Sequence, residues 1–371
     1  MHMGSRLMKS IRKNLFGVIT LVLSAGVLLA FLFSSDGINS LKEISKTIQY
    51  HWLIWAVLAA VMAWILEGFV LNMLCKVVYP EWKFRYSFCI GMVGVLYSAL
   101  TPFSTGGQPM QIYSMHRLGM DTGAAGSIIA MKTLVYQVVL VLYSLVMVIW
   151  KLPFFQTNIS GFSFLTIFGL VCNSTFIFLV LLFCISERLT DNLLHKGIWL
   201  FHKLHLCKHP DERYEKIHRE LSVFHGSSFL LRKSWKIYFG ACVFTVVQIA
   251  CTCLIPYFIY RSFGFSQQPV SVIMAAQAYV SMVSAFVPLP GASGGAEGSF
   301  VLFFNTFFQN GTIIPAMVVW RTLTYYLNFP VGCICTYIAG RLPALSLSRV
   351  QKTAQTERLN RGRFVLMVGR R

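Results

Sequence analysis

The sequence predicts an all-α polytopic membrane protein with about six full transmembrane helices and two re-entrant broken helical hairpins, arranged as an inverted-topology repeat. Of its 371 residues, 56% are hydrophobic and only 12% are charged, whereas a soluble domain carries about 25% charged residues. Several apolar runs exceed the roughly 18 residues needed to cross a hydrocarbon core. Two further apolar stretches are interrupted by proline and glycine, and the interruptions recur at a nearly constant offset.

The first expected span covers about 14–34. It is interpreted as a retained helix, because no small-residue cleavage site follows its apolar core. Residues 1–9 are assigned to a tag and cytoplasmic N-terminus, since MHMGS is typical of a vector leader. The remaining full spans are expected at 51–75, 122–150, 163–186, 237–260 and 312–340.

Positive charge sets the expected orientation. Of 32 Lys and Arg residues, ten lie in the loop 187–236, eight in 341–371 and four in 6–13. The positive-inside rule therefore predicts that the N-terminus, this loop and the tail 343–371 are cytoplasmic. A basic inner face suits anionic lipids, and no recognition motif accompanies it, so we expect no nucleic-acid partner.

Topology then predicts the two hairpins. The helix 51–75 ends inside and 122–150 begins inside, so the stretch 86–112 must enter from the cytoplasm and return to it. By the same reasoning, 270–309 enters from the outside. Three spans and one re-entrant element in each half predict inverted repeats over 10–150 and 163–342.

Two internal matches support the repeat. The pairs Gly106–Gly107 and Gly294–Gly295 lie 188 residues apart, in TPFSTGGQ and LPGASGGAE. The motifs Lys132-Thr-Leu-Val-Tyr136 and Arg321-Thr-Leu-Thr-Tyr325 lie 189 apart.

Broken helices inside a membrane survive only in protein or along a watery cavity, because lipid cannot satisfy the freed backbone groups. A helix that restarts after Gly-Gly directs N–H donors and its positive dipole end toward an anion. The alternative is a simple kink for close helix packing. The candidate tip residues for binding and translocation are Ser104, Thr105, Gly106, Gly107, Gln108, Gln111, Ser293, Gly294, Gly295 and Glu297.

Four ionisable residues lie at membrane depth: Glu67, Lys132, Glu297 and Arg321. A charge there costs about 2.5–3.5 kcal/mol and usually faces a partner or water. The cations predict a cavity for a phosphate-like anion, and the carboxylates either receive a cationic headgroup or pair with the cations. The alternative is a set of structural ion pairs that lock the halves together, and the sequence does not say which carboxylate pairs with which cation.

Tyr325, Tyr326 and Asn328 are further candidates to line the cavity, and Pro330 is expected to kink the last helix. The stretch 213–221 predicts a helix on the inner leaflet. We identify no catalytic constellation and expect no cofactor. The cluster His202, His205, Cys207 and His209 matches no standard metal site, so no metal is expected.

The duplicated hairpins TPFSTGGQPMQIY and LPGASGGAEGSF resemble the membrane region of bacterial lysylphosphatidylglycerol synthase/flippases, the multiple peptide resistance factors, and related stand-alone membrane proteins. The resemblance covers roughly 10–342. It implies translocation of phosphatidylglycerol or its aminoacyl ester between leaflets, resistance to cationic antimicrobial peptides, and a bacterial cell membrane location. The resemblance also implies two possible partners: a second copy of the chain in a homodimer, and a separate soluble aminoacyltransferase.

Full-length members of that family carry a soluble transferase domain. Only 343–371 follow the last expected span here, so we expect this polypeptide alone to lack transferase activity. Gln108 stands where many relatives have an acidic residue, which leaves the headgroup preference open. The alternatives are a membrane subunit of a phosphatidylglycerol lysyltransferase, and a secondary transporter of a small solute.

Overall fold

The computed structural model describes residues 26, 48–158, 162–186, 188, 190–192, 194–196, 199, 210–233, 235–284, 287–309 and 311–345. Every regular element in these ranges is helical, as predicted. Three sequence expectations lie outside them: the span 14–34 apart from Gly26, the His/Cys cluster of 202–209, and the tail beyond 345.

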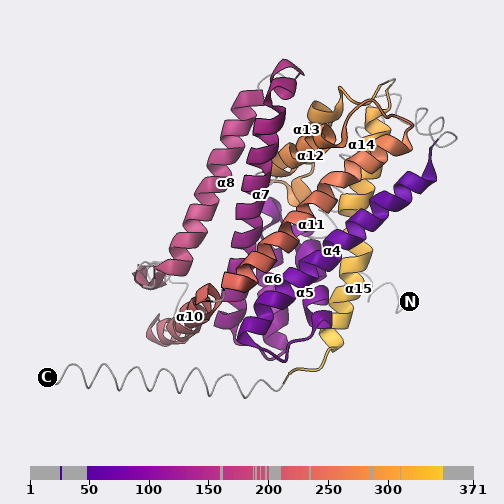
Figure 1. The fold of residues 1–371 in the computed structure, drawn as a ribbon. Helices are drawn as coiled ribbons and strands as arrows, with labels where there is room; N and C mark the ends of the chain where they lie inside the picture. The colour runs from indigo at the N-terminus through magenta and orange to yellow at the C-terminus, as the bar shows by residue number, and fades with distance from the viewer. Residues whose placement is uncertain are drawn as a thin grey trace.

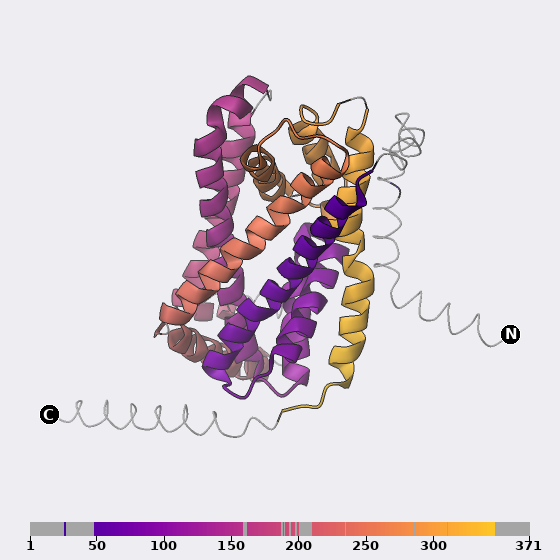
Figure 2. The ribbon, with the colours of Figure 1, turned by 45° about the vertical axis from the view of Figure 1, so that its right-hand side comes forward.

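Three helices of the described ranges are long and apolar enough to cross a membrane. They are α4 (Tyr50–Val78), the Thr122–Met147 part of α7 (Thr122–Asn158), and α11 (Trp235–Ser262). They confirm the spans predicted at 51–75, 122–150 and 237–260. Helix α8 (Phe162–Ile185) coincides with the expected span 163–186, and its residues from Gly169 form a pair with 190–196 that is bent by 94°. Helices α4 and α11 lie side by side across the molecule (Figures 1 and 2).

The stretch predicted as one span at 312–340 is divided into three segments. Helix α14 (Ile313–Arg321) leads into a π-helical turn, Thr322–Tyr326, and then into α15 (Asn328–Arg341). The kink predicted at Pro330 is therefore misplaced. Pro330 lies in the first turn of α15, where a missing N–H breaks no helical bond, and the irregularity comes directly after Arg321. Single π turns within helices frequently mark functional sites.

Both predicted broken hairpins are present. The first is α5 (Phe84–Leu100), a 3-10 turn (Pro102–Ser104) and α6 (Gly107–Arg117). The second is α12 (Val270–Ser284), a 3-10 turn (Pro290–Ala292) and α13 (Gly295–Phe304). The two helices of each hairpin pack on each other, and the two 3-10 turns touch. The hairpins occupy opposite ends of the molecule, so their tips meet between them (Figure 1).

The two tips share an unusual backbone conformation. Phe103 and Ser104 have φ values of 52° and 54°, and Gly291 and Ala292 have 60° and 55°. These pairs are 188 residues apart, the offset of the Gly-Gly pairs. Non-glycine residues in the left-handed region cost about 1–3 kcal/mol each and persist only where the surrounding structure imposes them. The same left-handed backbone conformation therefore occurs at matching positions of the two halves. The residue types Phe103 and Ser104 do not predict it, because left-handed φ values favour glycine.

The glycines that follow serve close approach and backbone freedom. A Cβ on Gly107 would lie 2.5 Å from the Gly94 carbonyl oxygen, so only glycine lets α6 begin against α5. Gly294 has φ 83°, which side chains rarely adopt. Both tips thus need glycine immediately before or at the helix start, but for different steric reasons.

Two apolar clusters hold the helices together. One lies around the second hairpin and contains Phe300, Phe303, Phe304 and Trp320, packed with residues of α11 and with Phe155 of α7. The other lies around the first hairpin and joins α4 and α6 to α7, with Phe224 of α10 (Pro210–Lys233). Each hairpin therefore has its own core, and α4, α7 and α11 contribute to both.

Helix α10 contains the predicted helix at 213–221, and it packs directly on the start of α7. The Glu220 carboxylate accepts the Gly123 N–H at 2.8 Å, which places a negative charge at the positive end of α7. At its other end Tyr214 donates to Asp191 at 2.8 Å, and this hydrogen bond lowers the pKa of the Asp191 carboxyl. The loop helix is thus attached to the protein, a contact that the inner-leaflet interpretation did not include.

Gly123→Ala should loosen this attachment. The added Cβ would lie 2.1 Å from the Glu220 carbonyl oxygen and 2.9 Å from the Phe224 N, both backbone atoms that cannot move aside. We expect a loss of about 1–3 kcal/mol of unfolding free energy in detergent, as for other overpacked sites.

Gly126→Ala is the matched control. Its Cβ would meet only the Phe224 ring, at 3.5 Å, and alanine is the better helix former by about 0.5–1 kcal/mol. Equal unfolding midpoints for the two variants would contradict the described packing of α10 on α7.

Candidate functional site

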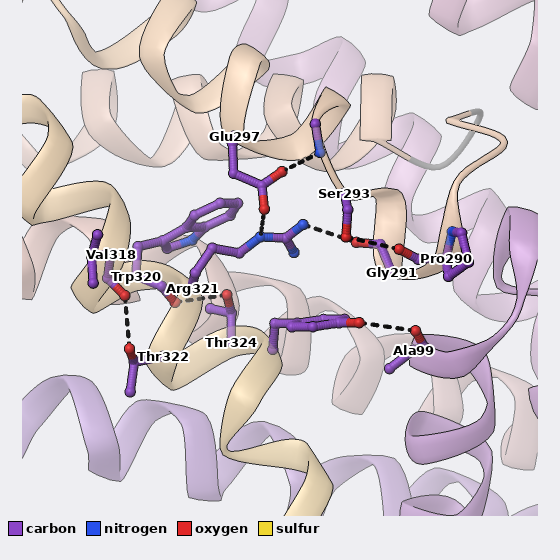
Figure 3. Close-up of polar contacts among 12 residues, drawn as sticks. Ala99, Pro290, Gly291, Ser293, Glu297, Val318, Trp320, Arg321, Thr322 and Thr324 are labelled. Carbon is purple, nitrogen blue, oxygen red and sulfur yellow. Dashed lines mark hydrogen bonds and ion pairs between the residues drawn. The ribbon is translucent and has the colours of Figure 1, made fainter. Parts of the chain in front are cut away.

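A buried ion pair joins the second tip to the helix that follows it. Arg321 ends α14, and Glu297 lies in the first turn of α13. Arg321 Nε donates to Glu297 Oε1 at 2.6 Å. The other carboxylate oxygen, Oε2, accepts the N–H of Gly294 at 2.7 Å (Figure 3). Each oxygen of Glu297 therefore has a donor.

The guanidinium also reaches the turn itself. Arg321 Nη2 donates to the Gly291 carbonyl at 3.0 Å, and its Cζ lies 4.7 Å from the centre of the Tyr325 ring. The Tyr325 hydroxyl in turn donates to the Ala99 carbonyl at 3.2 Å, near the end of α5 (Figure 3). A Cβ on Gly291 would lie 2.1 Å from the Tyr325 ring. One cation thus connects the second tip to the first hairpin through an aromatic ring.

Water has almost no access to this pair. The side chains of Arg321 and Glu297 are 5% and 0% exposed. A buried pair is held by strong attraction, and removing one partner leaves an uncompensated charge. Ser293 is also buried at the tip, where its hydroxyl donates to the Pro290 carbonyl at 2.9 Å.

The first half carries a second ion pair, between Lys132 of α7 and Glu67 of α4. Lys132 also lies 3.5 Å from Oε1 of Gln111 on α6. Gln248 of α11 donates to the other Glu67 oxygen at 3.1 Å. The side chains of Lys132 and Glu67 are 11% and 13% exposed, so this four-helix cluster is slightly more accessible than the Arg321 pair.

These pairings answer the question that the sequence left open. Among the residues that the structure describes, each ion pair lies within its own half, so these pairs do not lock the two halves together as the alternative suggested. Hydrogen bonds do cross between the halves. Gln248 donates to Glu67, Tyr325 to the Ala99 carbonyl, and Trp64 to Asn328 at 3.0 Å. Arg117 of α6 also donates to the Gly340 carbonyl of α15, at 3.3 Å.

The halves also differ in which element supplies the carboxylate. In the second half it comes from the hairpin tip, at Glu297. In the first half it comes from the long helix α4, and the hairpin contributes the amide of Gln111 in the comparable position. Of the two glutamines considered from sequence, Gln111 and not Gln108 thus faces the cation of its half.

The remaining predicted residues of the first tip lie near its turn. Ser104 and Thr105 are exposed, and Gln108 is partly buried. The Gly106 N–H donates to the Thr101 hydroxyl at 2.7 Å, and the Thr105 hydroxyl donates to the Pro102 carbonyl at 2.9 Å. The accessible polar groups of this tip are therefore neutral hydroxyls and an amide.

Two residues of these networks were missed from sequence. Gln248 and Trp64 lie alone in apolar helices, where nothing in the sequence separates them from packing residues. Asn328, proposed to line a cavity, is buried and bonded to Trp64 and to the Thr324 carbonyl. Tyr326 contacts the Tyr325 ring edge-on. Within the described residues, no group of three or more His, Cys, Asp or Glu side chains could hold a metal ion.

Comparison with known proteins gives two matches. A family profile described as "Lysylphosphatidylglycerol synthase TM region" matches residues 17–332. A protein of Archaeoglobus fulgidus described as "UPF0104 membrane protein" is 26% identical over 304 residues, which cover 79% of this chain and 88% of that protein. The residues matched by the family profile include the two hairpins and both ion pairs.

Glu297→Ala should be strongly destabilising. It leaves Arg321 buried without its counter-charge and Gly294 without an acceptor, so we expect a loss of about 3–5 kcal/mol in unfolding free energy. Denaturant titration in detergent, followed by tryptophan fluorescence, measures this loss.

The double variant Glu297→Gln/Arg321→Gln removes both charges and keeps polar side chains of similar length. It should recover most of the lost stability, because no unpaired charge remains. Two outcomes would contradict the buried ion pair described here. One is a single variant with the unfolding free energy of the wild type. The other is a double variant that is no more stable than the single variant.

Proposed function

The chain belongs to the lysylphosphatidylglycerol synthase TM region family, and from this premise we propose that it translocates phospholipids between the leaflets of a membrane. The lipid headgroup passes the region where the two hairpin tips meet, while the acyl chains stay in the bilayer. The single observation that carries the proposal is the contact between two broken hairpins that come from opposite ends of the molecule, with a buried arginine at their junction.

A phosphate group matches the chemistry of this junction. Arg321 and Lys132 are cations that can bind phosphate oxygens, the former bidentately. The α6 helix also begins at the first tip, where its N–H groups and dipole favour an anion. A lipid phosphate meets donors from both halves at the level of the breaks, which makes the desolvation of its charge less costly.

The proposal includes six full spans and an inverted-topology repeat. The order of long helix, broken hairpin and further helix recurs from α4 to α7 and from α11 to α15. The matching left-handed backbone at the two tips and the nearly constant offset support it. We place the chain in a cell membrane with both termini in the cytoplasm, on the basis of its positive charge.

Reconstitution tests this proposal. The purified chain is incorporated into liposomes with fluorescent phosphatidylglycerol, and a membrane-impermeant reductant bleaches the label that reaches the outer leaflet. We expect wild type to bleach well beyond the outer-leaflet half. Glu297→Gln/Arg321→Gln should slow this at least about tenfold, since a charge-assisted hydrogen bond is worth about 1.5–3 kcal/mol.

Arg341→Ala serves as the matched control. Arg341 ends α15 and is exposed, with Tyr337 as its aromatic neighbour. It should bleach as wild type does. Wild-type protein that is folded yet indistinguishable from empty liposomes would refute translocation, and equal rates in the wild type and the double variant would remove the ion pair from the site.

A further inference from the structure

We propose that Cys89 and Cys335 are a modification site, where oxidation forms a reversible disulfide that arrests translocation. The disulfide follows from the way α5 packs on α15, whereas the arrest rests on the translocation proposed above. The two cysteines come from different halves of the chain, since Cys89 lies in the first hairpin and Cys335 in the last helix.

Helices α5 and α15 lie side by side (Figure 1) and approach each other closely. A Cβ on Gly332 of α15 would lie 2.6 Å from the Leu96 Cβ and 3.3 Å from the Met92 carbonyl oxygen of α5. A residue without a side chain is what lets two helix backbones come this near. Gly332 therefore marks the level at which the two helices are in closest register.

The cysteine pair lies one turn from this contact. Cys89 precedes Met92 by three residues, and Cys335 follows Gly332 by three. Residues three apart share a helix face. In antiparallel helices successive contacts run in opposite directions along the two chains, so the next contact falls on the cysteine pair. Cys89, Met92 and Cys335 accordingly form one buried cluster, and the two thiols are hydrogen-bonded to each other.

The neighbouring cysteine of α15 has a different environment. Cys333 lies two residues before Cys335 and is exposed, whereas Cys89 and Cys335 are 7% and 4% exposed. The thiols of the pair are free in this structure. Disulfide formation needs two sulfurs in contact and Cβ atoms that face each other, and the packing of α5 on α15 brings the two thiols together in this way.

The oxidant in this proposal is a peroxide. The thiolate of one cysteine attacks the O–O bond, which gives a sulfenic acid on that sulfur and releases hydroxide. The sulfur of the other thiol then attacks the sulfenic sulfur, so that the S–S bond forms, the S–O bond breaks and water leaves. Two thiols lose two electrons in total, and one peroxide becomes two waters. A small dithiol reverses the step by thiol–disulfide exchange.

The position of the pair suits a reversible switch. Cys89 lies five residues after the start of α5, and Cys335 six residues before the end of α15, which is about 7–9 Å along each axis at 1.5 Å per residue. In the proposed topology these helix ends are cytoplasmic, and cytoplasmic disulfides are mostly transient and redox-sensing. Arg85, one turn before Cys89, is exposed at this end, and a neighbouring cation is typical of cysteines that oxidise.

The disulfide would join the first hairpin covalently to the second half. The hydrogen bond from the Tyr325 hydroxyl to the Ala99 carbonyl also joins α5 to the second half, but it can break and re-form. Transporters built from inverted repeats work by movement of one repeat against the other. A covalent bond between α5 and α15 prevents that movement until the bond is reduced.

The first measurement is chemical and does not depend on translocation. The full chain in liposomes is treated with hydrogen peroxide, unfolded in a thiol-blocking reagent and digested with trypsin. We expect the peptides 86–117 and 322–341 to be joined, and to separate in dithiothreitol. Because the peptide 322–341 also contains Cys333, two variants assign the bond: Cys333→Ser should still form it, and Cys335→Ser should not.

The second measurement follows lipid movement. Short-chain fluorescent phosphatidylglycerol is extracted from the outer leaflet with albumin, since a chemical reductant would open the disulfide. We expect oxidised wild type to lose translocation in proportion to the fraction that is cross-linked, and to regain it after dithiothreitol. Oxidised Cys335→Ser should keep the rate of the reduced protein. Oxidised Cys333→Ser, the matched control, should lose translocation as wild type does.

The outcomes separate this inference from the proposal beneath it. If folded wild type yields no link between the two peptides, the modification site is overturned. If the link forms and the translocation rate is unchanged, or if dithiothreitol opens the link without restoring the rate, the arrest is overturned. If reduced wild type moves lipid no faster than empty liposomes do, translocation itself fails, and the peptide analysis still decides whether the disulfide forms.

Discussion

Breaking a helix within an apolar protein frees backbone N–H and C=O groups that hydrocarbon cannot satisfy, and the arrangement of this molecule depends on how those groups find partners. At the second tip one ion pair satisfies a backbone N–H and a backbone carbonyl. The Glu297 carboxylate accepts the Gly294 N–H, and Arg321 donates to the Gly291 carbonyl. At the first tip the Thr101 hydroxyl accepts the Gly106 N–H. The Tyr325 hydroxyl donates to the Ala99 carbonyl, so the second half satisfies an acceptor of the first.

The two halves therefore share a backbone but not a charge arrangement. Both turns pass through two consecutive left-handed residues, and both are followed by a helix that starts at the second glycine of a pair. Their cations occupy corresponding positions in the sequence. Arg321, however, pairs with Glu297 of the second hairpin, whereas Lys132 pairs with Glu67 of the long helix α4. The second tip is consequently the more rigidly tied and the drier of the two, and the first tip exposes neutral polar groups.

This asymmetry gives the proposed translocation a physical form. The second tip is held in place by a buried ion pair whose side chains are 5% and 0% exposed. The first tip exposes hydroxyls and an amide, which can form hydrogen bonds with a lipid headgroup in the proposed translocation.

The sequence by itself determined the helical class, the positions of α4, α7 and α11, both hairpin breaks and the repeat offset. These features follow from hydropathy and from Pro and Gly, which act locally along the chain. It also identified Glu67, Lys132, Glu297 and Arg321, because a charged side chain within an apolar run is costly unless it faces a partner or water.

Only the tertiary structure decided which of those charges meet. Glu67 and Lys132 lie 65 residues apart, and Trp64 and Asn328 lie 264 apart, so their contacts depend on how whole helices pack. The same holds for Gln248, which is ordinary in sequence and specific only because α11 lies against α4. The break placed at Pro330 moved to Thr322–Tyr326 for a related reason: proline in a first turn costs no hydrogen bond, whereas the contacts of Arg321 and Tyr325 with both tips set the geometry of the turn between them.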